Sequence, residues 1–210
     1  VCQIGFQSFG SAALPVLRDV IAAGELGDLL GVGAAGAWVR TDGYYARTPW
    51  AGRRHLNGAA VVDGALTNPF AHAVATALLV AGAQADDGAR ISLELHRTRP
   101  IEADDTSCVR VAAPGRPPVV VAVTLCAATN HEPYLVVRGS RADAVWRYKT
   151  DHLTVGGRVI EIGPPTDLLH NLLRHRAAPD RVPLLAPLAD TRTFTRVVRA
   201  VRDAPPAPPW

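Results

Sequence analysis

The middle of the sequence is a succession of short apolar segments separated by turn residues, and this pattern restricts the fold more than any other feature. Many segments alternate apolar and polar residues, as strands with one buried and one solvent-facing side do, and Gly, Pro, Asp or Asn separates them. Gly156-Gly157 indicates a hairpin turn between the last two. The predicted strands are 91–97, 106–112, 118–125, 134–138, 142–148, 152–155 and 158–162.

Segments with helical spacing of apolar residues lie before and after these strands. The expected helices are 11–23, 67–80, 166–176 and 191–202. Thr67 or Asn68 is a candidate cap for the second helix and Asp190 for the last, since their side-chain oxygens can accept from unpaired N–H groups. A strand over 29–40 and a long polar, aromatic loop over 41–56 are expected between the first two helices. This order predicts an α+β fold, a large, mostly antiparallel open sheet with helices packed on one face.

The predicted elements from residue 1 to residue 203 form one domain, and a Pro-rich tail at 204–210 is expected to fray. A chain of 210 residues can bury a core without disulfides or metals. The sequence opens on an apolar, strand-like segment, 1–6, and contains no methionine. Natural proteins seldom start inside a strand, so we expect a piece of a longer chain.

Composition excludes several classes of function. The net charge is only +3, and the basic residues are scattered singly apart from the pair Arg53-Arg54, so no nucleic-acid partner is expected. Arginine replaces lysine except at Lys149, which indicates a GC-rich bacterial genome. No signal peptide and no membrane-spanning apolar segment is present, so we expect a cytoplasmic protein without a membrane partner. Cys2, Cys108 and Cys126 have no metal-binding spacing, so free thiols and no metal site are expected.

The run Gly31-Val-Gly-Ala-Ala-Gly36 matches the GxGxxG pattern of dinucleotide-binding loops. In such loops the pattern opens a helix, and an acidic residue follows about twenty residues later. Here a strand-like segment follows, while Asp42 comes too soon and Asp63 too late. We therefore interpret the run as a glycine-rich strand against which another part of the chain packs closely.

The segment Tyr44–Gly82 carries the most specific pattern of the chain. It contains a tyrosine-bearing loop, Trp-Ala-Gly, a small-residue turn, and a helix with Asn-Pro-Phe-Ala-His near its start and Val-Ala-Gly at its end. This segment resembles the Gfo/Idh/MocA oxidoreductases, whose corresponding helix begins Asp-x-Gly-x-His and ends Leu-x-Gly. His72 matches the family histidine, whereas Asn68 and Phe70 replace its aspartate and glycine. At the level of pattern, the resemblance extends over essentially the whole chain.

The resemblance implies the C-terminal, substrate-binding domain of an NAD(P)-dependent oxidoreductase that transfers hydride between a nicotinamide cofactor and a sugar, polyol or related alcohol. The family's N-terminal Rossmann domain, with its cofactor loop and catalytic lysine, is absent from this sequence. Lys149, in the β-rich region, does not match that lysine. NAD or NADP is therefore expected to bind mainly to the missing domain, and this chain alone is expected to be inactive.

The same resemblance assigns roles to individual residues. His72 is expected to take the hydroxyl proton of the substrate, because a histidine titrates near neutral pH. Asn68, one helical turn earlier, is expected to hydrogen-bond the substrate or His72, although it cannot act as a base. The residues expected to bind the substrate are Tyr44, Tyr45, Trp50 and Arg53, because aromatic faces suit the C–H faces of sugars and polar tips suit their hydroxyls.

Other interpretations of these residues remain open at this point. His72 also fits a core histidine on an apolar helix, and each aromatic residue of the loop also fits a structural role. A non-catalytic sugar-binding or oligomerisation module would show much the same sequence, and an unrelated hydrolase or isomerase has no motif in its favour. The sheet face without helices is expected to be covered by a second subunit in a homodimer or homotetramer.

Overall fold

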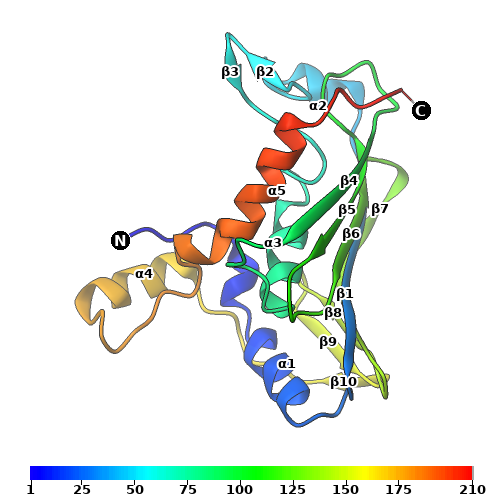
Figure 1. Cartoon of the computed structure of the whole chain (residues 1–210). Coiled ribbons are helices and arrows are strands. Elements are labelled where there is room, and N and C mark those ends of the chain that lie inside the picture. Colours follow the sequence, from blue (N-terminus) through cyan, green and yellow to red (C-terminus); the bar gives the residue numbers. More distant parts are fainter. Residues whose placement is uncertain (210) are drawn as a thin grey trace.

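The computed structural model of the chain describes residues 1–209 and has an eight-stranded sheet at its centre (Figure 1). Its strands are β1 (Leu29–Val39), β4 (Arg90–His96), β5 (Thr106–Ala112), β6 (Val119–Thr124), β7 (Cys126–Gly139), β8 (Ala144–Arg147), β9 (His152–Val155) and β10 (Arg158–Ile160). Their order across the sheet is β10-β9-β8-β7-β1-β6-β5-β4. Neighbouring strands run antiparallel except β1 and β6, which are parallel. The predicted fold class is confirmed.

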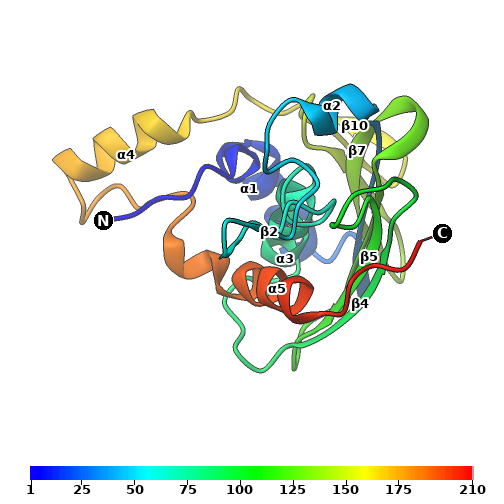
Figure 2. The same ribbon diagram turned by 90° about the horizontal axis from the view of Figure 1, so that it is seen from above.

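Helices lie on one face of this sheet, and the opposite face carries none in the described part of the chain (Figures 1 and 2). The covering helices are α1 (Ala13–Ala22), α3 (Ala71–Val80) and α5 (Arg192–Asp203). Helix α4 (Leu168–Ala177) projects away from the body of the domain (Figure 1). The remaining elements are η1 (Gln7–Gly10), α2 (Asp42–Ala46), β2 (His55–Leu56), β3 (Ala59–Ala60) and η2 (Leu188–Thr191).

Helix α3 is the centre of the core. All its residues from Ala73 to Leu79 are buried, and four of the ten are alanines, which let the helix lie close to β1. Just before the helix, Phe70 is fully buried and its ring stacks on Trp38 of β1 with centroids 4.4 Å apart. A Cβ at Gly36 would lie 2.2 Å from the Phe70 ring, so this position requires glycine. The glycine run therefore lies inside β1 at a close packing contact, as interpreted from the sequence.

Several boundaries agree with the sequence. The strands at 106–112 and 152–155 are found as expected, and the last hairpin turns at Gly156 and Gly157. Both glycines have positive φ, 54° and 82°, as the favoured two-residue hairpin turn requires.

Other expectations were wrong. Segment 1–6 is not a strand, because only an isolated bridge joins Gln3 to Pro187. The expected loop at 41–56 contains α2 and the start of a small hairpin. Neither Thr67 nor Asn68 caps the second helix, because residues 65–70 form turns and the helix starts at Ala71. The Thr67 hydroxyl instead donates to the Val62 carbonyl. Asp190 does not cap the last helix either, since it lies in η2.

The expectation of a frayed tail was also wrong for residues 204–209. Arg54 donates hydrogen bonds to the carbonyls of Ala204 and Pro205, at 2.6 and 3.2 Å. Arg97 donates through Nε to the carbonyl of Ala207, whose side chain is buried. Two arginines thus anchor a segment that has few N–H groups of its own, because proline lacks them. Trp210, the last residue of the expected tail, lies outside the described residues.

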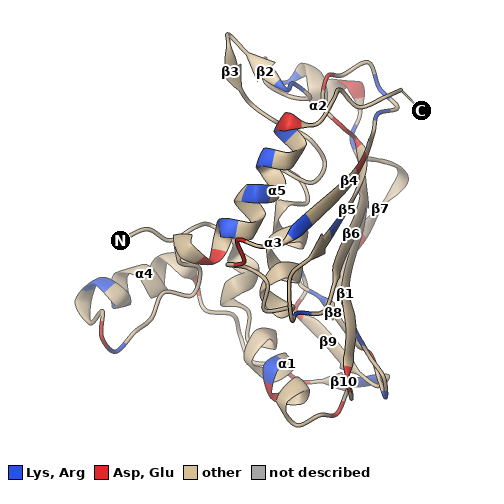
Figure 3. Ribbon diagram, viewed as in Figure 1, with Lys and Arg blue, Asp and Glu red and all other residues tan. Residues whose placement is uncertain are grey.

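Charged residues are spread over the domain, with a row of arginines along α5 (Figure 3). Two of them hold the loop that follows α3: Arg196 donates to the carbonyls of Asp86 and Ala89, and Arg192 donates to that of Ala85. This part of the row therefore has a structural role. None of the helices in residues 1–209 has the length and apolar character needed to cross a bilayer.

The contact between Gly36 and Phe70 yields a stability test. Gly36→Ala is expected to lower the free energy of unfolding by about 1–3 kcal/mol, because the added methyl group overpacks the core and Phe70 has no room to withdraw. Gly163→Ala is the matched control: its Cβ would meet nothing within 4 Å, so the expected change is below about 0.5 kcal/mol. Urea unfolding measures both. Equal stability of the two variants would contradict the packing argument.

Candidate active site at the start of helix α3

A pocket of about 470 Å³ opens at the start of α3. It is formed by residues that are far apart in the sequence, from η1, the end of β1, the turn before α3 and the turn after β8. Its lining residues are Gln7, Ser8, Trp38, Asn68, Pro69, His72, Tyr148 and Lys149. This volume falls within the range of about 300–1,000 Å³ typical of small-molecule sites.

His72 is the second residue of α3 and lies half-buried in this pocket. The ring of Phe6 contacts the imidazole edge-on, with centroids 5.3 Å apart. Burial lowers the pKa of His72 below its ordinary value of 6.5. The unpaired N–H groups at a helix start also disfavour a positive charge there. The imidazole is therefore neutral at pH 7 and able to accept a proton.

Asn68 lies in the turn before α3, and Asp63 fixes its side chain. The Nδ2 of Asn68 donates to Oδ1 of Asp63 at 2.5 Å, which assigns the orientation of the amide. Asp63 is buried, and its Oδ2 accepts from the backbone N–H of Gly52 at 2.7 Å. Because its donor side is engaged, Asn68 offers mainly its carbonyl oxygen to a ligand. An acceptor at this position suits a hydroxyl hydrogen.

Sequence reasoning missed that Asp63 holds Asn68, because Asp63 was considered as an acid of a dinucleotide motif and rejected for its spacing. Replacement of Asn68 by the family's aspartate would set a second carboxylate at hydrogen-bonding distance from Asp63. Two carboxylates this close repel each other when both are ionised. The presence of asparagine in this chain is therefore consistent with the buried acid beside it.

Lys149 and Tyr148 are pocket residues that the sequence did not reveal. Both follow β8, and the Nζ of Lys149 lies 5.2 Å from the ring centroid of Trp38. Burial, and then the charge of Glu132, raise the pKa of the Tyr148 hydroxyl, so it remains a neutral hydrogen-bond donor. The only signal in the sequence was that Lys149 is its sole lysine. It still does not match the family's catalytic lysine.

The four loop residues expected to bind substrate do not line this pocket. Tyr45 and Arg53 line a second one of about 320 Å³, in which Arg53 forms an ion pair with Glu102. The buried Tyr45 hydroxyl has no hydrogen-bond partner among residues 1–209, and burial raises its pKa. Tyr44 and Trp50 both stack against Arg47 (4.0 and 5.3 Å). The structure thus brings His72 and Asn68 together and separates Tyr45 and Arg53 from them.

Within residues 1–209 no group of three or more His, Cys, Asp or Glu side chains could hold a metal ion. The cysteines are free thiols; Cys2 is exposed, and Cys108 and Cys126 are partly buried.

The pocket thus lies in an α+β domain whose helices cover one face of a large open sheet. The profile of the GFO/IDH/MocA C-terminal domain matches residues 16–145, and the chain belongs to this family. A search of curated proteins returned no match.

Solved structures share the fold at low sequence identity. Levoglucosan dehydrogenase, in complex with NADH and levoglucosan, superposes with a TM-score of 0.71 at 17% identity over 96% of this chain and 63% of its own. The WlbA dehydrogenase from Bordetella pertussis, in complex with NADH and UDP-GlcNAcA, superposes with a TM-score of 0.64 at 20% identity. The match covers 94% of this chain and 61% of the WlbA chain. A super-repressor mutant of Gal80p from Saccharomyces cerevisiae superposes with a TM-score of 0.65 at 14% identity. The match covers 95% of this chain and 61% of the Gal80p chain. This chain thus spans 61–63% of the length of these proteins.

The lowered pKa of His72 can be measured directly. In an NMR titration of the histidine side chains, the His72 resonance is expected to have its midpoint below 6.5. Because the unfolded chain then protonates before the folded one, His72 reduces stability as the pH falls from 6.5 through its folded pKa, and has no such effect above 6.5. His72→Gln assigns the signal by removing it. A midpoint at or above 6.5 would contradict the burial argument.

Proposed function

We propose that this chain is the substrate-binding domain of an NAD(P)-dependent oxidoreductase that transfers hydride between a nicotinamide cofactor and a sugar, polyol or related alcohol. The observation that carries the proposal is the neutral, half-buried His72 in a pocket where Asn68 presents a hydrogen-bond acceptor. The family membership and the fold shared with sugar dehydrogenases support it.

The glycine-rich run of this chain does not fit a dinucleotide site. The glycine run of 31–36 lies inside β1 with Gly36 against Phe70, so it cannot wrap around a diphosphate. In this proposal NAD or NADP is therefore held mainly by a nucleotide-binding domain outside this chain. When bound there, the cofactor supplies the acceptor or donor of the hydride.

His72 and Asn68 have complementary tasks in alcohol oxidation. The carbon loses its hydrogen as a hydride while the hydroxyl loses a proton, so a carbonyl forms and the charges balance. The neutral imidazole of His72 accepts that proton. The Asn68 oxygen accepts a hydrogen bond from a neighbouring hydroxyl and so orients the carbon. In the reverse direction His72 returns the proton to the carbonyl oxygen.

The loop residues expected to bind substrate enter this proposal differently. Tyr45 and Arg53 belong to the second pocket, so any contact with a substrate would be with a part distant from the reacting carbon. Tyr44 and Trp50 are connected to Trp38 of the main pocket through the stacked side chains of Arg40 and Arg47. His72 and Asn68 therefore remain the proposed catalytic pair.

Replacing His72 in the full-length protein tests this function. His72→Ala is expected to lower kcat by about 10²–10⁴, the usual contribution of a positioned general base, as followed by nicotinamide absorbance across a panel of polyols. His55→Ala, at an exposed histidine of β2, is the control and should retain full turnover. Retained turnover in His72→Ala would reject the catalytic role. No nicotinamide-dependent turnover in the wild-type protein would favour a non-catalytic binding or oligomerisation module.

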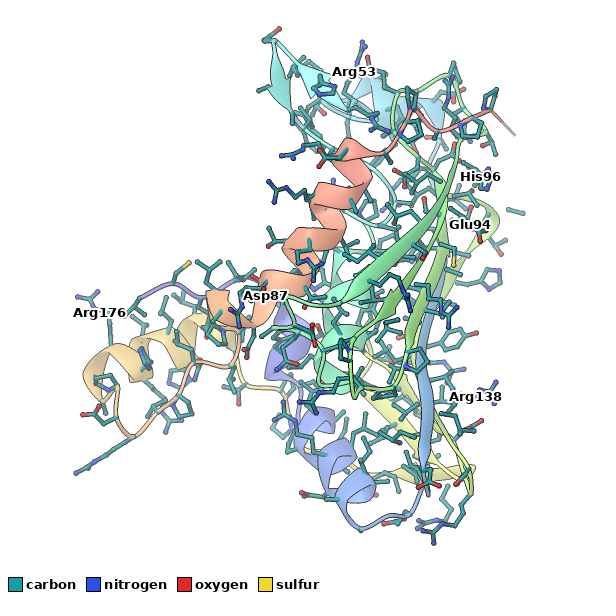
Figure 4. The ribbon with its side chains drawn as sticks, viewed as in Figure 1. Arg53, Asp87, Glu94, His96, Arg138 and Arg176 are labelled. Atoms are coloured by element: carbon teal, nitrogen blue, oxygen red, sulfur yellow. The ribbon has the colours of Figure 1, made fainter. Side chains whose placement is uncertain are left out.

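We further propose that the chain forms a homodimer or homotetramer through the helix-free face of the sheet. Small residues of β1 and β6 leave a hollow of about 530 Å³ on this face, and Val120 and Tyr134 are 41% and 38% exposed there. Figure 4 shows His96, Glu94 and Arg138 projecting from the same face. A shallow surface with exposed apolar side chains is suited to pairing with its own copy.

Charge introduced on this face is expected to separate the subunits. The double variant Val120→Glu, Tyr134→Glu should run as a monomer in light scattering coupled to size-exclusion chromatography, because facing subunits would then bury like charges. Arg199→Ala, at an exposed residue of α5 on the helical side, is the control and should leave the assembly unchanged. An unchanged mass for the double variant would place the subunit contact elsewhere.

A further inference from the structure

Six side chains near the active-site pocket form a row in which cations and aromatic rings alternate. The Nζ of Lys149 and the guanidinium of Arg40 lie 5.2 and 5.1 Å from the ring centroid of Trp38. Arg40 also lies 4.6 Å from the ring of Tyr44. Arg47 continues the row, at 4.0 Å from Tyr44 and 5.3 Å from Trp50. We call this set the cation–aromatic row: Lys149, Trp38, Arg40, Tyr44, Arg47 and Trp50.

The three cations of the row are not neutralised by acids. None of them forms an ion pair within residues 1–209, whereas Arg53 and Arg99, from the same region, pair with Glu102 and Asp42. Glu132, which adjoins the turn that carries Lys149, accepts a hydrogen bond from Thr150 at 2.7 Å. Three positive charges therefore remain together without a carboxylate partner.

Arg40 is the member of the row whose charged group is least well satisfied by hydrogen bonds. Its Nη1 donates to the carbonyl of Val39 at 3.2 Å, while its Nε is buried without a partner in the described chain. Stacking on two rings stabilises such a cation, and the stabilisation grows as the cation is desolvated. A partly desolvated guanidinium still gains from a nearby negative charge, because the attraction is stronger where water is excluded. The row thus provides a positive potential without its own counter-charge.

The row reaches the proposed reaction site at Lys149, which lines the same pocket as His72 and Asn68. Its ammonium group has three donors and no acceptor, and it binds carboxylates and phosphates through charge-assisted hydrogen bonds. The Asn68 oxygen and the Tyr148 hydroxyl, which line the same pocket, can hydrogen-bond the neutral hydroxyls of a substrate. We infer that the substrate is a sugar or polyol derivative with an anionic group, a carboxylate or a phosphate, bound by Lys149 with Arg40 and Arg47 behind it. This inference rests on the proposed function.

Binding of matched sugars to the full-length protein tests the inference. The probes are D-glucose, D-glucuronate and D-glucose 6-phosphate, and calorimetry at two salt concentrations gives their affinities. At least one of the two anionic sugars is expected to bind about tenfold more tightly than glucose. This difference in affinity should become smaller at the higher salt concentration. Preference for glucuronate identifies a carboxylate as the anionic group, and preference for glucose 6-phosphate identifies a phosphate.

Variants assign the effect to Lys149. Lys149→Ala is expected to weaken binding of the preferred anionic sugar about tenfold and to leave glucose unchanged, while Lys149→Arg keeps most of the preference. Arg174→Ala, at an exposed residue of α4, removes one positive charge away from the pocket and should change neither affinity. Circular dichroism verifies that each variant is folded.

Equal binding of neutral and anionic sugars, or the same loss of affinity for both in Lys149→Ala, would overturn the inference. Absence of binding by every probe also overturns it. Turnover of neutral polyols without any anionic preference rejects the anionic substrate and leaves the proposed oxidoreductase intact. Binding of an anionic sugar that depends on Lys149, in a protein without nicotinamide-dependent turnover, supports the anion site and rejects the proposed function.

Discussion

The contact between Phe70 and Gly36 determines the geometry of the rest of the site. The Phe70 ring fills the space that a side chain at Gly36 would occupy, so the start of α3 is held against the centre of β1. His72 follows Phe70 by two residues, and Trp38 follows Gly36 by two residues along the strand. One packing contact therefore sets two walls of the pocket. A shift of this helix would move the imidazole and the indole relative to each other.

A second constraint is the buried carboxylate of Asp63, which joins two segments that have little regular structure. It holds the backbone at Gly52 and the side chain of Asn68 with its two oxygens. Because a buried carboxylate needs such donors to offset the loss of water, both segments are drawn to it. The cost of burying one carboxylate thus orients an amide that lines the pocket. Stability and the proposed function therefore depend on the same group.

The sequence supported the fold better than the site because the two depend on different kinds of information. Alternating apolar residues reveal a strand and its buried face locally, so the sheet and most helices could be predicted. His72, which lines the pocket, was singled out through the family resemblance of its segment. Lys149 reaches the pocket only because β8 pairs with β7 and so brings the following turn near Trp38. No local pattern encodes such a contact. The docked tail was missed for the same reason, since Arg54 and Arg97 reach it from distant segments.

The position of β1 has a consequence for how this chain is made. This strand is the first of the sheet in the sequence, yet its neighbours are β6 and β7, which come after the α3 segment and the β4–β5 hairpin. During synthesis β1 and the very apolar α3 therefore leave the ribosome before the strands that complete their layer. Long-range pairing of this kind slows folding and leaves apolar surface exposed in the meantime. The same central strand that fixes the pocket in the finished domain makes the nascent chain prone to aggregation.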